Sequence, residues 1–246
     1  MEIREYENIY KLGNTYWWYK ILDSLIIDTV KKYSQDKKMN ILDAGCGTGR
    51  IMEKLNPFGE IEGIDSSPEA IKYCSLRGQK NVVLTNINQW IPQNKKYNLI
   101  ICLDVLYHET VINVDKVIST FHEALNQNGI LIVNLPAFNI LKRHHDSVVG
   151  GARRFKKSTF SKILINSGFK INTITYRLPI LFLVILLTKY IFNKDEQPVT
   201  SDLQTINSNL NKFLYKFHLL ENKLIELGLN IPFGSSLFAV ALKPSK

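Results

Sequence analysis

The chain has 246 residues, of which 45% are hydrophobic and 22% are charged. This length fits one large domain or one domain with an added subdomain, and the composition excludes a low-complexity or repetitive chain. The formal charge of +9 fits a nucleic acid, an anionic substrate or an anionic membrane about equally well, because lysines are spread along the whole chain.

The cysteines and the first residues indicate the compartment. Cys46, Cys74 and Cys102 show neither paired nor metal-type spacing, so we expect buried thiols in a reducing environment. The first ten residues are charged and lack the apolar stretch of a signal peptide. We therefore expect a cytoplasmic protein.

An aromatic segment comes first along the chain. Residues 6–18 are rich in aromatic side chains, and the run Tyr-Trp-Trp-Tyr occupies positions 16–19. An amphipathic helix is predicted over residues 20–34. We expect residues 1–38 to form an N-terminal cap on a domain of residues 39–246.

The most informative segment reads Ile-Leu-Asp-Ala-Gly-Cys-Gly-Thr-Gly-Arg at 41–50. A predicted strand ends at Asp43, and Gly45, Gly47 and Gly49 follow at alternate positions. Glycine at this density lets the backbone turn tightly and approach a ligand closely. A helix is predicted directly afterwards, with its free N–H groups facing the same cleft. The spacing differs from that of dinucleotide sites, and a carboxylate at the strand tip suits a cation better than a pyrophosphate.

A second predicted strand, residues 60–65, also ends in a carboxylate, that of Asp65. A helix is predicted to follow, with Ser67 as its cap and Pro68 at its first position. An acidic residue about twenty positions after a glycine loop typically accepts both ribose hydroxyls. The two acids and the glycines together predict a ligand that carries an ammonium group and a ribose, as S-adenosylmethionine does.

The remaining elements continue this alternation. Strands are predicted over 81–84, 97–103, 129–135, 169–176 and 236–242, and helices over 158–167 and 202–227. The alternation from residue 39 to residue 135 predicts an α/β fold with a parallel sheet and helices on both faces. A long polar loop is predicted over 136–157.

These motifs resemble those of the class I S-adenosylmethionine-dependent methyltransferases over residues 39–135. The resemblance implies a Rossmann-like seven-stranded sheet whose last strand lies antiparallel between its neighbours, and S-adenosyl-L-methionine as the cofactor. Asn86 stands where many members have aspartate, and we expect it to serve the adenine amino group. The residues that the resemblance places against the cofactor are Asp43, Gly45, Cys46, Gly47, Gly49, Asp65, Ser66, Asn86, Ile87, Leu103 and Asp104.

The segment Asp-Val-Leu-Tyr-His at 104–108 is similar to the Glu-x-x-Glu-His segment of quinone-pathway O-methyltransferases. Some of those enzymes bind a divalent metal through the carboxylates, but Tyr107 replaces one of them here, so we expect no metal. A general base at a hydroxyl acceptor adds about 10²–10⁴-fold to the rate, and His108 is the first catalytic candidate. The alternative is a histidine bonded to the backbone at a helix start. Tyr107 is a candidate for acceptor contact.

A second constellation lies in the polar loop. His145, next to Asp146, is a candidate for an oriented base, since a carboxylate fixes the tautomer of an imidazole. Arg153 and Arg154 offer forked donors to a phosphate or carboxylate of the acceptor. The alternative is a solvated loop with incidental charges. This stretch, the early tryptophans and residues 231–235 resemble bacterial methyltransferases linked to polysaccharide or lipid modification.

Residues 178–192 are strongly apolar. As a helix they rise about 22 Å, short of the ~30 Å hydrocarbon core, so we expect no membrane span. Two interpretations remain. The run belongs to a helical insertion of residues 178–227 over the active site, or it lies on an anionic membrane surface, which suits a lipid-linked acceptor.

The sequence thus predicts a methyltransferase that acts on the oxygen of a small-molecule, sugar or lipid-linked acceptor. RNA or protein methylation and a non-catalytic S-adenosylmethionine-binding partner are the alternatives. Nucleic acid is not expected, because residues 104–108 lack the Asn/Asp-Pro-Pro-aromatic signature of base-amine methylation and the sequence carries no recognisable RNA-binding module.

Overall fold

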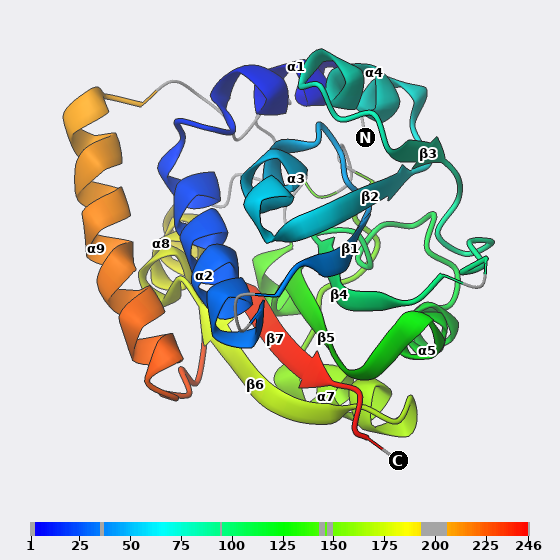
Figure 1. Cartoon of the computed structure of the whole chain (residues 1–246). Helices are drawn as coiled ribbons and strands as arrows, with labels where there is room; N and C mark the ends of the chain where they lie inside the picture. The colour runs from blue at the N-terminus through cyan, green and yellow to red at the C-terminus, as the bar shows by residue number, and fades with distance from the viewer. Residues whose placement is uncertain are drawn as a thin grey trace.

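The computed structural model describes residues 3–34, 37–93, 95–142, 146, 150–192 and 206–245. Within these residues a seven-stranded sheet has the order β3-β2-β1-β4-β5-β7-β6 (Figure 1). The strands are β1 (Met39–Ala44), β2 (Gly59–Asp65), β3 (Val82–Leu84), β4 (Tyr97–Leu103), β5 (Leu125–Pro136), β6 (Lys170–Arg177) and β7 (Ser236–Leu242). The helices are α1 (Ile3–Leu12), α2 (Trp17–Ser34), α3 (Arg50–Leu55), α4 (Pro68–Leu76), α5 (Val114–Ala124), α7 (Lys157–Asn166), α8 (Pro179–Phe192) and α9 (Ser208–Glu226), with short 3-10 turns at Asn56–Phe58 and Asn139–Leu141.

The last strand lies where the resemblance placed it. β7 pairs antiparallel with β5 and with β6, so that Phe238 lies opposite Asn134 on one side and Thr175 on the other. The other strand pairs are parallel. The Rossmann-like methyltransferase sheet is therefore confirmed. Because β6 runs parallel to β5 across β7, the carboxyl ends of β1, β2, β4, β5 and β6 share one edge of the sheet.

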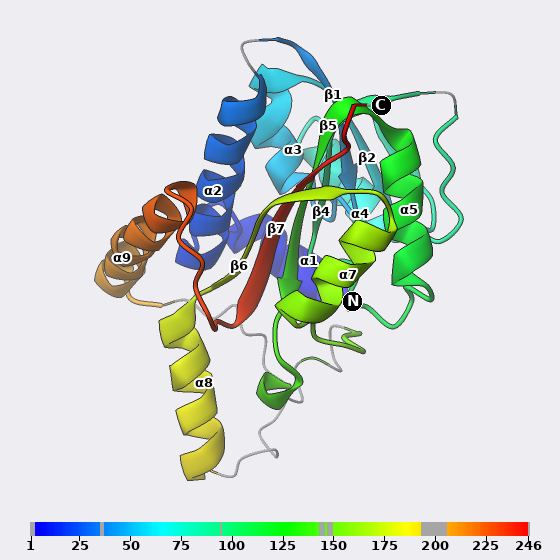
Figure 2. The same cartoon turned by 90° about the horizontal axis from the view of Figure 1, so that it is seen from below.

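Helices cover both faces of this sheet. Ile41 and Leu99 face a core built with α2, α3 and α4, whereas Leu42 and Ile100 face a core built with α5 and α7. This alternation is the two-residue period of a strand that is buried on both faces. Figure 2 shows α2 and α3 on one side of the strands and α5 and α7 on the other.

Most predicted boundaries hold to within a residue or two, but one strand and two helices differ more. β5 begins at Leu125, four residues before the predicted start at residue 129. α2 begins at Trp17, three residues before the predicted start, so the aromatic run is helical. α9 begins at Ser208 rather than at residue 202, and residues 202–205 lie outside the described ranges. Ser67 occupies the cap position of α4 with Pro68 first in the helix, although no hydrogen bond from the Ser67 side chain caps it.

Several large apolar side chains of α9 face outward, although Leu214 packs beside Trp17 and Ile225 is buried. His218, Glu221 and Asn222 are buried against α2, whereas Phe213 and Leu220 are 63% and 61% exposed. The Glu221 carboxylate accepts hydrogen bonds from the Leu178 amide at 2.8 Å and contacts the His218 ring at 2.9 Å, which explains why polar side chains are tolerated there.

The apolar run 178–192 forms α8, which extends from the body of the molecule in Figure 2. Ile185 is buried, but Leu183 and Leu187 are more than half exposed. Within the described ranges, every helix is too short or too polar to cross a membrane.

Candidate cofactor and acceptor site

The glycine loop follows β1 at the shared carboxyl edge. Gly45 and Gly47 have left-handed backbones, with φ of 88° and 54°. A Cβ on Gly45 would lie 2.2 Å from Cγ2 of Val105, so this glycine lets the loop pack directly on the segment after β4. A Cβ on Gly47 would meet no described atom within 4 Å. The loop therefore leaves open space beside Gly47.

Asp65, at the end of β2, holds this loop in place. Its Oδ2 accepts the Gly47 amide at 2.9 Å, and its Oδ1 accepts the Ser67 amide at 3.0 Å. Burial raises the pKa of Asp65, while backbone donors at Gly47, Ser67 and Ser66 lower it. The carboxylate has about four lone-pair sites, so the backbone donors still leave capacity for a ribose hydroxyl.

Asp43, at the end of β1, is 1% exposed, and its Oδ2 has no hydrogen-bond partner among the described residues. Burial raises its pKa to about 8, with Arg50 opposing and Asp65 reinforcing that rise. A buried carboxylate with an unpartnered oxygen is stabilised by a positive ligand group.

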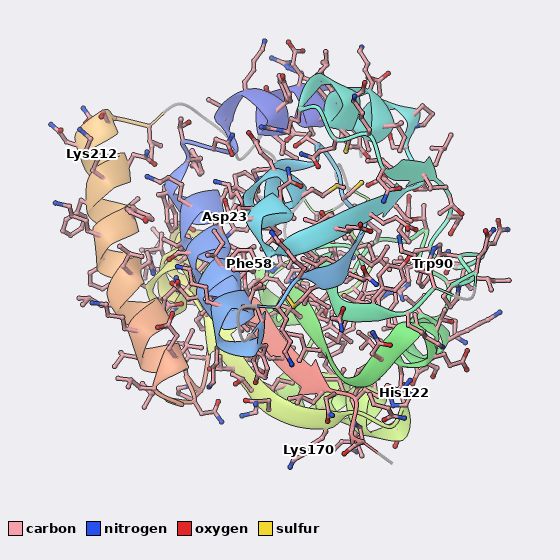
Figure 3. All side chains as sticks on the ribbon, in the orientation of Figure 1. Asp23, Phe58, Trp90, His122, Lys170 and Lys212 are labelled. Carbon is pink, nitrogen blue, oxygen red and sulfur yellow. The ribbon has the colours of Figure 1, made fainter. Side chains whose placement is uncertain are left out.

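The N-terminal helices lie against the same loop. Burial raises the pKa of the Tyr6 hydroxyl of α1, with Ser67 opposing and Asp65 reinforcing that rise, so Tyr6 lies near both residues. On α2, the Tyr19 ring lies 4.6 Å from the Arg50 guanidinium at the start of α3. Asp23, labelled on α2 in Figure 3, pairs with the same arginine. The aromatic segment predicted as a cap is thus packed beside the glycine loop.

The segment after β3 contains the expected adenine contacts. The Asn86 Oδ1 accepts the Asn88 backbone amide at 2.9 Å and the Asn88 side-chain amide at 2.6 Å. Because the oxygen of Asn86 is engaged, its amide nitrogen is the group left for a ligand. This nitrogen is a donor, so it suits a ring nitrogen of adenine, which accepts, better than the adenine amino group, which donates. Ile87 is partly buried and packs on the core beside α5.

Asp104 directly follows Leu103 at the end of β4. Both of its carboxylate oxygens accept from the Asn134 amide, at 3.0 and 3.2 Å. Burial raises the pKa of Asp104 to about 6, against the lowering effects of Asn134, Arg177, Arg50 and Arg154. Three guanidinium groups therefore lie within electrostatic range of the half-buried Asp104 carboxyl.

Non-glycine residues with left-handed backbones gather at this edge. Asp104 (φ 52°), Phe138 (φ 54°) and Leu178 (φ 60°) come just after β4, β5 and β6. Such conformations cost about 1–3 kcal/mol each and are concentrated at functional sites. Their shared position supports a site along the ends of these three strands.

Tyr107 and His108 lie in the loop after Asp104. Their rings are 4.3 Å apart, and both are half-buried. A Cβ on Gly150 would lie 3.3 Å from the His108 Nδ1, and His108 forms a backbone bridge with Gly151. Burial and the charge of Asp104 raise the pKa of Tyr107, so its hydroxyl stays protonated at neutral pH.

The arginines of the polar loop have different surroundings from those expected. Arg154 pairs through two nitrogens with Asp146, with Nη2 2.7 Å from Oδ1 and Nε 3.3 Å from Oδ2, and its Nη1 donates to the Ala137 carbonyl at 3.2 Å. Its fork is thus occupied within the protein. Arg153 is half-buried beside it, and His145 lies outside the described residues.

The three cysteines are free and buried, as expected. The Sγ atoms of Cys46 and Cys74 lie 3.7 Å apart, and the Cys74 thiol donates to the Gly47 carbonyl at 3.3 Å. Cys46 and Cys74 therefore support the glycine loop from beneath.

Comparison with known proteins identifies the fold family. Residues 35–168 match a family model described as a methyltransferase domain, which is more than half of the chain. The chain belongs to this methyltransferase family. It is an S-adenosylmethionine-dependent methyltransferase.

Individual relatives agree with this assignment. The methyltransferase is 30% identical over 151 residues to the ubiquinone biosynthesis O-methyltransferase of Rickettsia typhi, which covers 54% of this chain and 59% of that protein. The match thus spans less than two thirds of the relative. Among solved structures, the N-methyltransferase NodS from Bradyrhizobium japonicum, in complex with S-adenosyl-L-homocysteine, superposes with a TM-score of 0.56 at 15% identity, covering 96% of this chain and 91% of NodS. A Clostridium acetobutylicum S-adenosylmethionine-dependent methyltransferase gives a TM-score of 0.59 at 13% identity, covering 92% of each chain.

The residues at the edge fit this cofactor. The unpartnered Asp43 oxygen suits a cationic group, the Asp65 carboxylate suits a ribose, and the space beside Gly47 is open to a ligand. Within the described part of the chain, His, Cys, Asp and Glu side chains do not gather in threes as metal ligands.

Sequence reasoning missed Arg177 and Asn134, which complete the charged cluster around Asp104. Arg177 follows the predicted strand 169–176 directly. The sequence could have indicated Arg177, because a charged residue at the carboxyl end of a predicted strand lies at the same edge of the sheet as Asp43 and Asp65. Tyr19 and Arg50 were named only as parts of longer runs, and their pairing depends on how α2 packs on α3.

Proposed function

We propose that this methyltransferase transfers a methyl group to a hydroxyl of a small-molecule, sugar or lipid-linked acceptor. The observation that carries the proposal is the packing of Val105 on Gly45, because it sets the start of the 104–108 segment directly against the cofactor loop. The similarity of those residues to quinone-pathway O-methyltransferases supports oxygen as the methylated atom, as does the 30% identity to a ubiquinone biosynthesis O-methyltransferase.

The bound cofactor supplies an electrophilic methyl group on a sulfonium. In the proposed reaction, Asp43 and Asp65 hold its cationic and ribose parts, and the acceptor oxygen is held in line with the methyl, which contributes about 7–11 kcal/mol through orientation alone. His108 takes the proton of the acceptor hydroxyl, and Tyr107 contacts the acceptor. His145 remains a second proposed base, and Arg153 remains a proposed contact on the acceptor side, whereas Asp146 and the Ala137 carbonyl occupy the donors of Arg154.

The test is mass spectrometry of metabolite and lipid extracts incubated with the protein and methyl-labelled S-adenosylmethionine. We expect one compound to gain a single labelled methyl on oxygen. With that acceptor, His108→Ala is expected to lower kcat by about 10²–10⁴-fold without changing affinity for S-adenosylhomocysteine. His122→Ala is the matched control, since His122 lies on α5 against Phe169 and outside the site (Figure 3).

Three outcomes oppose the proposal. Label recovered on nitrogen or carbon contradicts O-methylation, and label that competing RNA abolishes favours a nucleic-acid acceptor. Cofactor binding with no labelled product in any extract favours a non-catalytic binding partner. Equal kcat for His108→Ala and His122→Ala removes His108 as the base.

We further propose that α8 rests on an anionic membrane surface, which would bring a lipid-linked acceptor to the site. Support comes from the apolar residues that α8 exposes and from Lys189 among them. α9 adds exposed lysines between exposed aromatic rings, including Lys212 on its outer side (Figure 3). The exposed apolar residues of α8 are Ile180, Leu183, Val184, Leu187, Tyr190 and Ile191.

Sedimentation with vesicles of phosphatidylglycerol and phosphatidylcholine tests this contact. We expect the wild type to pellet at low salt and Leu183→Glu/Leu187→Glu to remain in solution. Ile112→Glu, at an 82% exposed position away from α8, is expected to pellet like the wild type. If the wild-type protein stays in solution with the vesicles at low salt, the proposed contact of α8 with an anionic membrane is excluded.

A further inference from the structure

Arg177, the last residue of β6, is fully buried with 0% exposure. Its Nη1 donates to the Asn134 Oδ1 at 3.4 Å, which is a long hydrogen bond. Its Nε and Nη2 have no hydrogen-bond partner among the described residues. Buried polar groups are almost always satisfied, so two unpartnered nitrogens on one buried cation require an explanation.

The nearby acids do not satisfy these donors. Glu221 and Asp104 both raise the pKa of Arg177 electrostatically, which places them near it. The Glu221 oxygens already engage the Leu178 amide and the His218 ring. The Asp104 oxygens accept from Asn134. Each acid therefore attracts the guanidinium without forming a hydrogen bond to its buried Nε or Nη2.

Arg154 is an arginine of this protein whose guanidinium nitrogens all donate to protein acceptors, and it serves as a comparison for Arg177. Its Nε and Nη2 face the two oxygens of Asp146, and its Nη1 reaches a backbone carbonyl. Arg177 presents the equivalent Nε and Nη2 edge with no carboxylate against it. That edge matches two oxygens of a carboxylate or phosphate in geometry and charge.

Arg177 also lies on the acceptor side of the proposed site. Its side chain reaches from β6 past β7 to Asn134 on β5, and Asn134 in turn holds Asp104 beside the cofactor loop. Aromatic rings flank this end of β6: Phe138 stacks on Tyr176 at 4.5 Å, and Phe182 lies 5.4 Å from Phe233.

We infer that Arg177 anchors an oxyanion subsite, which takes a carboxylate or phosphate group of the acceptor through its Nε and Nη2 edge. The assignment of this anion to the acceptor rests on the proposed function. The aromatic rings at the same end of β6 suit an organic anion with an apolar body.

The test measures binding of unreactive probes to the protein loaded with S-adenosylhomocysteine, by titration calorimetry. Benzoate and phenyl phosphate carry the two oxyanions, and benzamide is the neutral analogue of the same shape as benzoate. We expect at least one oxyanion to bind about tenfold to a hundredfold more tightly than benzamide, because a charge-assisted pair is worth about 1.5–3 kcal/mol. Tighter binding of benzoate indicates a carboxylate site, and tighter binding of phenyl phosphate indicates a phosphate site.

Arg177→Met keeps the volume of the side chain and is expected to abolish the preference for oxyanions, while Arg177→Lys keeps the charge and retains only part of it. Lys170→Met is the matched control, since it removes an exposed cation from the opposite end of the same strand (Figure 3). It is expected to bind every probe as the wild type does.

Equal binding of all three probes by the wild type overturns the subsite, whether or not either Arg177 variant folds. An oxyanion preference that survives in Arg177→Met overturns the role of Arg177. Because the probes have no hydroxyl to methylate, these outcomes are independent of the O-methylation test. If the protein binds an oxyanion but yields no methylated product, the Arg177 subsite is supported and the proposed function is contradicted.

Discussion

Replacing Gly47 by alanine has two separable effects: it strains the backbone, and it places a methyl group in the space next to the glycine loop. Gly47 has φ of 54°, and a Cβ there would meet no described atom within 4 Å. The protein itself therefore imposes only the cost of a left-handed residue with a Cβ, about 1–2 kcal/mol. The same Cβ enters the space in which we place the nucleoside.

Gly78, just after α4, provides a matched control. It has φ of 75° and also no described atom within 4 Å of its Cβ position, but it lies outside the glycine loop. Both Gly47→Ala and Gly78→Ala should lower the free energy of unfolding by about 1–2 kcal/mol, which lowers Tm by about 2–8 °C in a domain of this size.

Only Gly47→Ala should weaken the ligand. An added methyl in a fitted space costs about 1–3 kcal/mol, so the Kd for S-adenosylhomocysteine should rise by about 5-fold to 150-fold. Calorimetric titration gives the Kd values, and urea unfolding gives the stabilities. The reasoning is refuted if Gly47→Ala binds S-adenosylhomocysteine as tightly as Gly78→Ala does.

Two further predictions concern buried acids. Because the pKa of Asp43 is raised to about 8, the unliganded folded protein holds a proton that the unfolded chain releases, so its free energy of unfolding should fall as pH rises from about 4 to about 8. Urea unfolding across this range should show a smaller fall for Asp43→Asn; an unchanged slope would contradict the burial of this carboxyl. Asp23→Asn removes the carboxylate that pairs with Arg50 and Lys54, and should lower the free energy of unfolding by about 3–5 kcal/mol. Asp28→Asn, in an exposed pair, should change it by less than about 0.5 kcal/mol, and equal effects of the two variants would refute this account.

Local patterns in the sequence predicted the strands and the cofactor loop. The apolar run of β4 and the terminal strand β7 match their predicted bounds, because a strand buried on both faces reads as a continuous apolar segment. The alternate glycines predicted a loop with unusual backbone angles, and Gly45 and Gly47 have them. Asp65 was predictable because its distance along the chain from the glycines follows from one strand–helix–strand unit.

The polar partners across the sheet were not predictable in this way. Asp104, Asn134 and Arg177 come from three strands, and the Arg177–Asn134 bond joins residues 43 positions apart. The fork of Arg154 is filled by Asp146, although the sequence offers a ligand as an equal alternative. The residues that surround Arg154 and Arg177 in the sequence do not indicate that Arg154 is paired with an acid and that Arg177 is not.

The sequence by itself determined the sheet, the glycine turn and the two strand-tip acids of this methyltransferase, because each depends on residues close together along the chain. The tertiary structure alone decided that α9 buries three polar side chains, that the N-terminal helices pack on the cofactor loop, and that two nitrogens of the buried Arg177 lack a partner among the described residues. The physical reason is that hydrogen bonding and burial of a polar side chain depend on which distant groups folding brings to it.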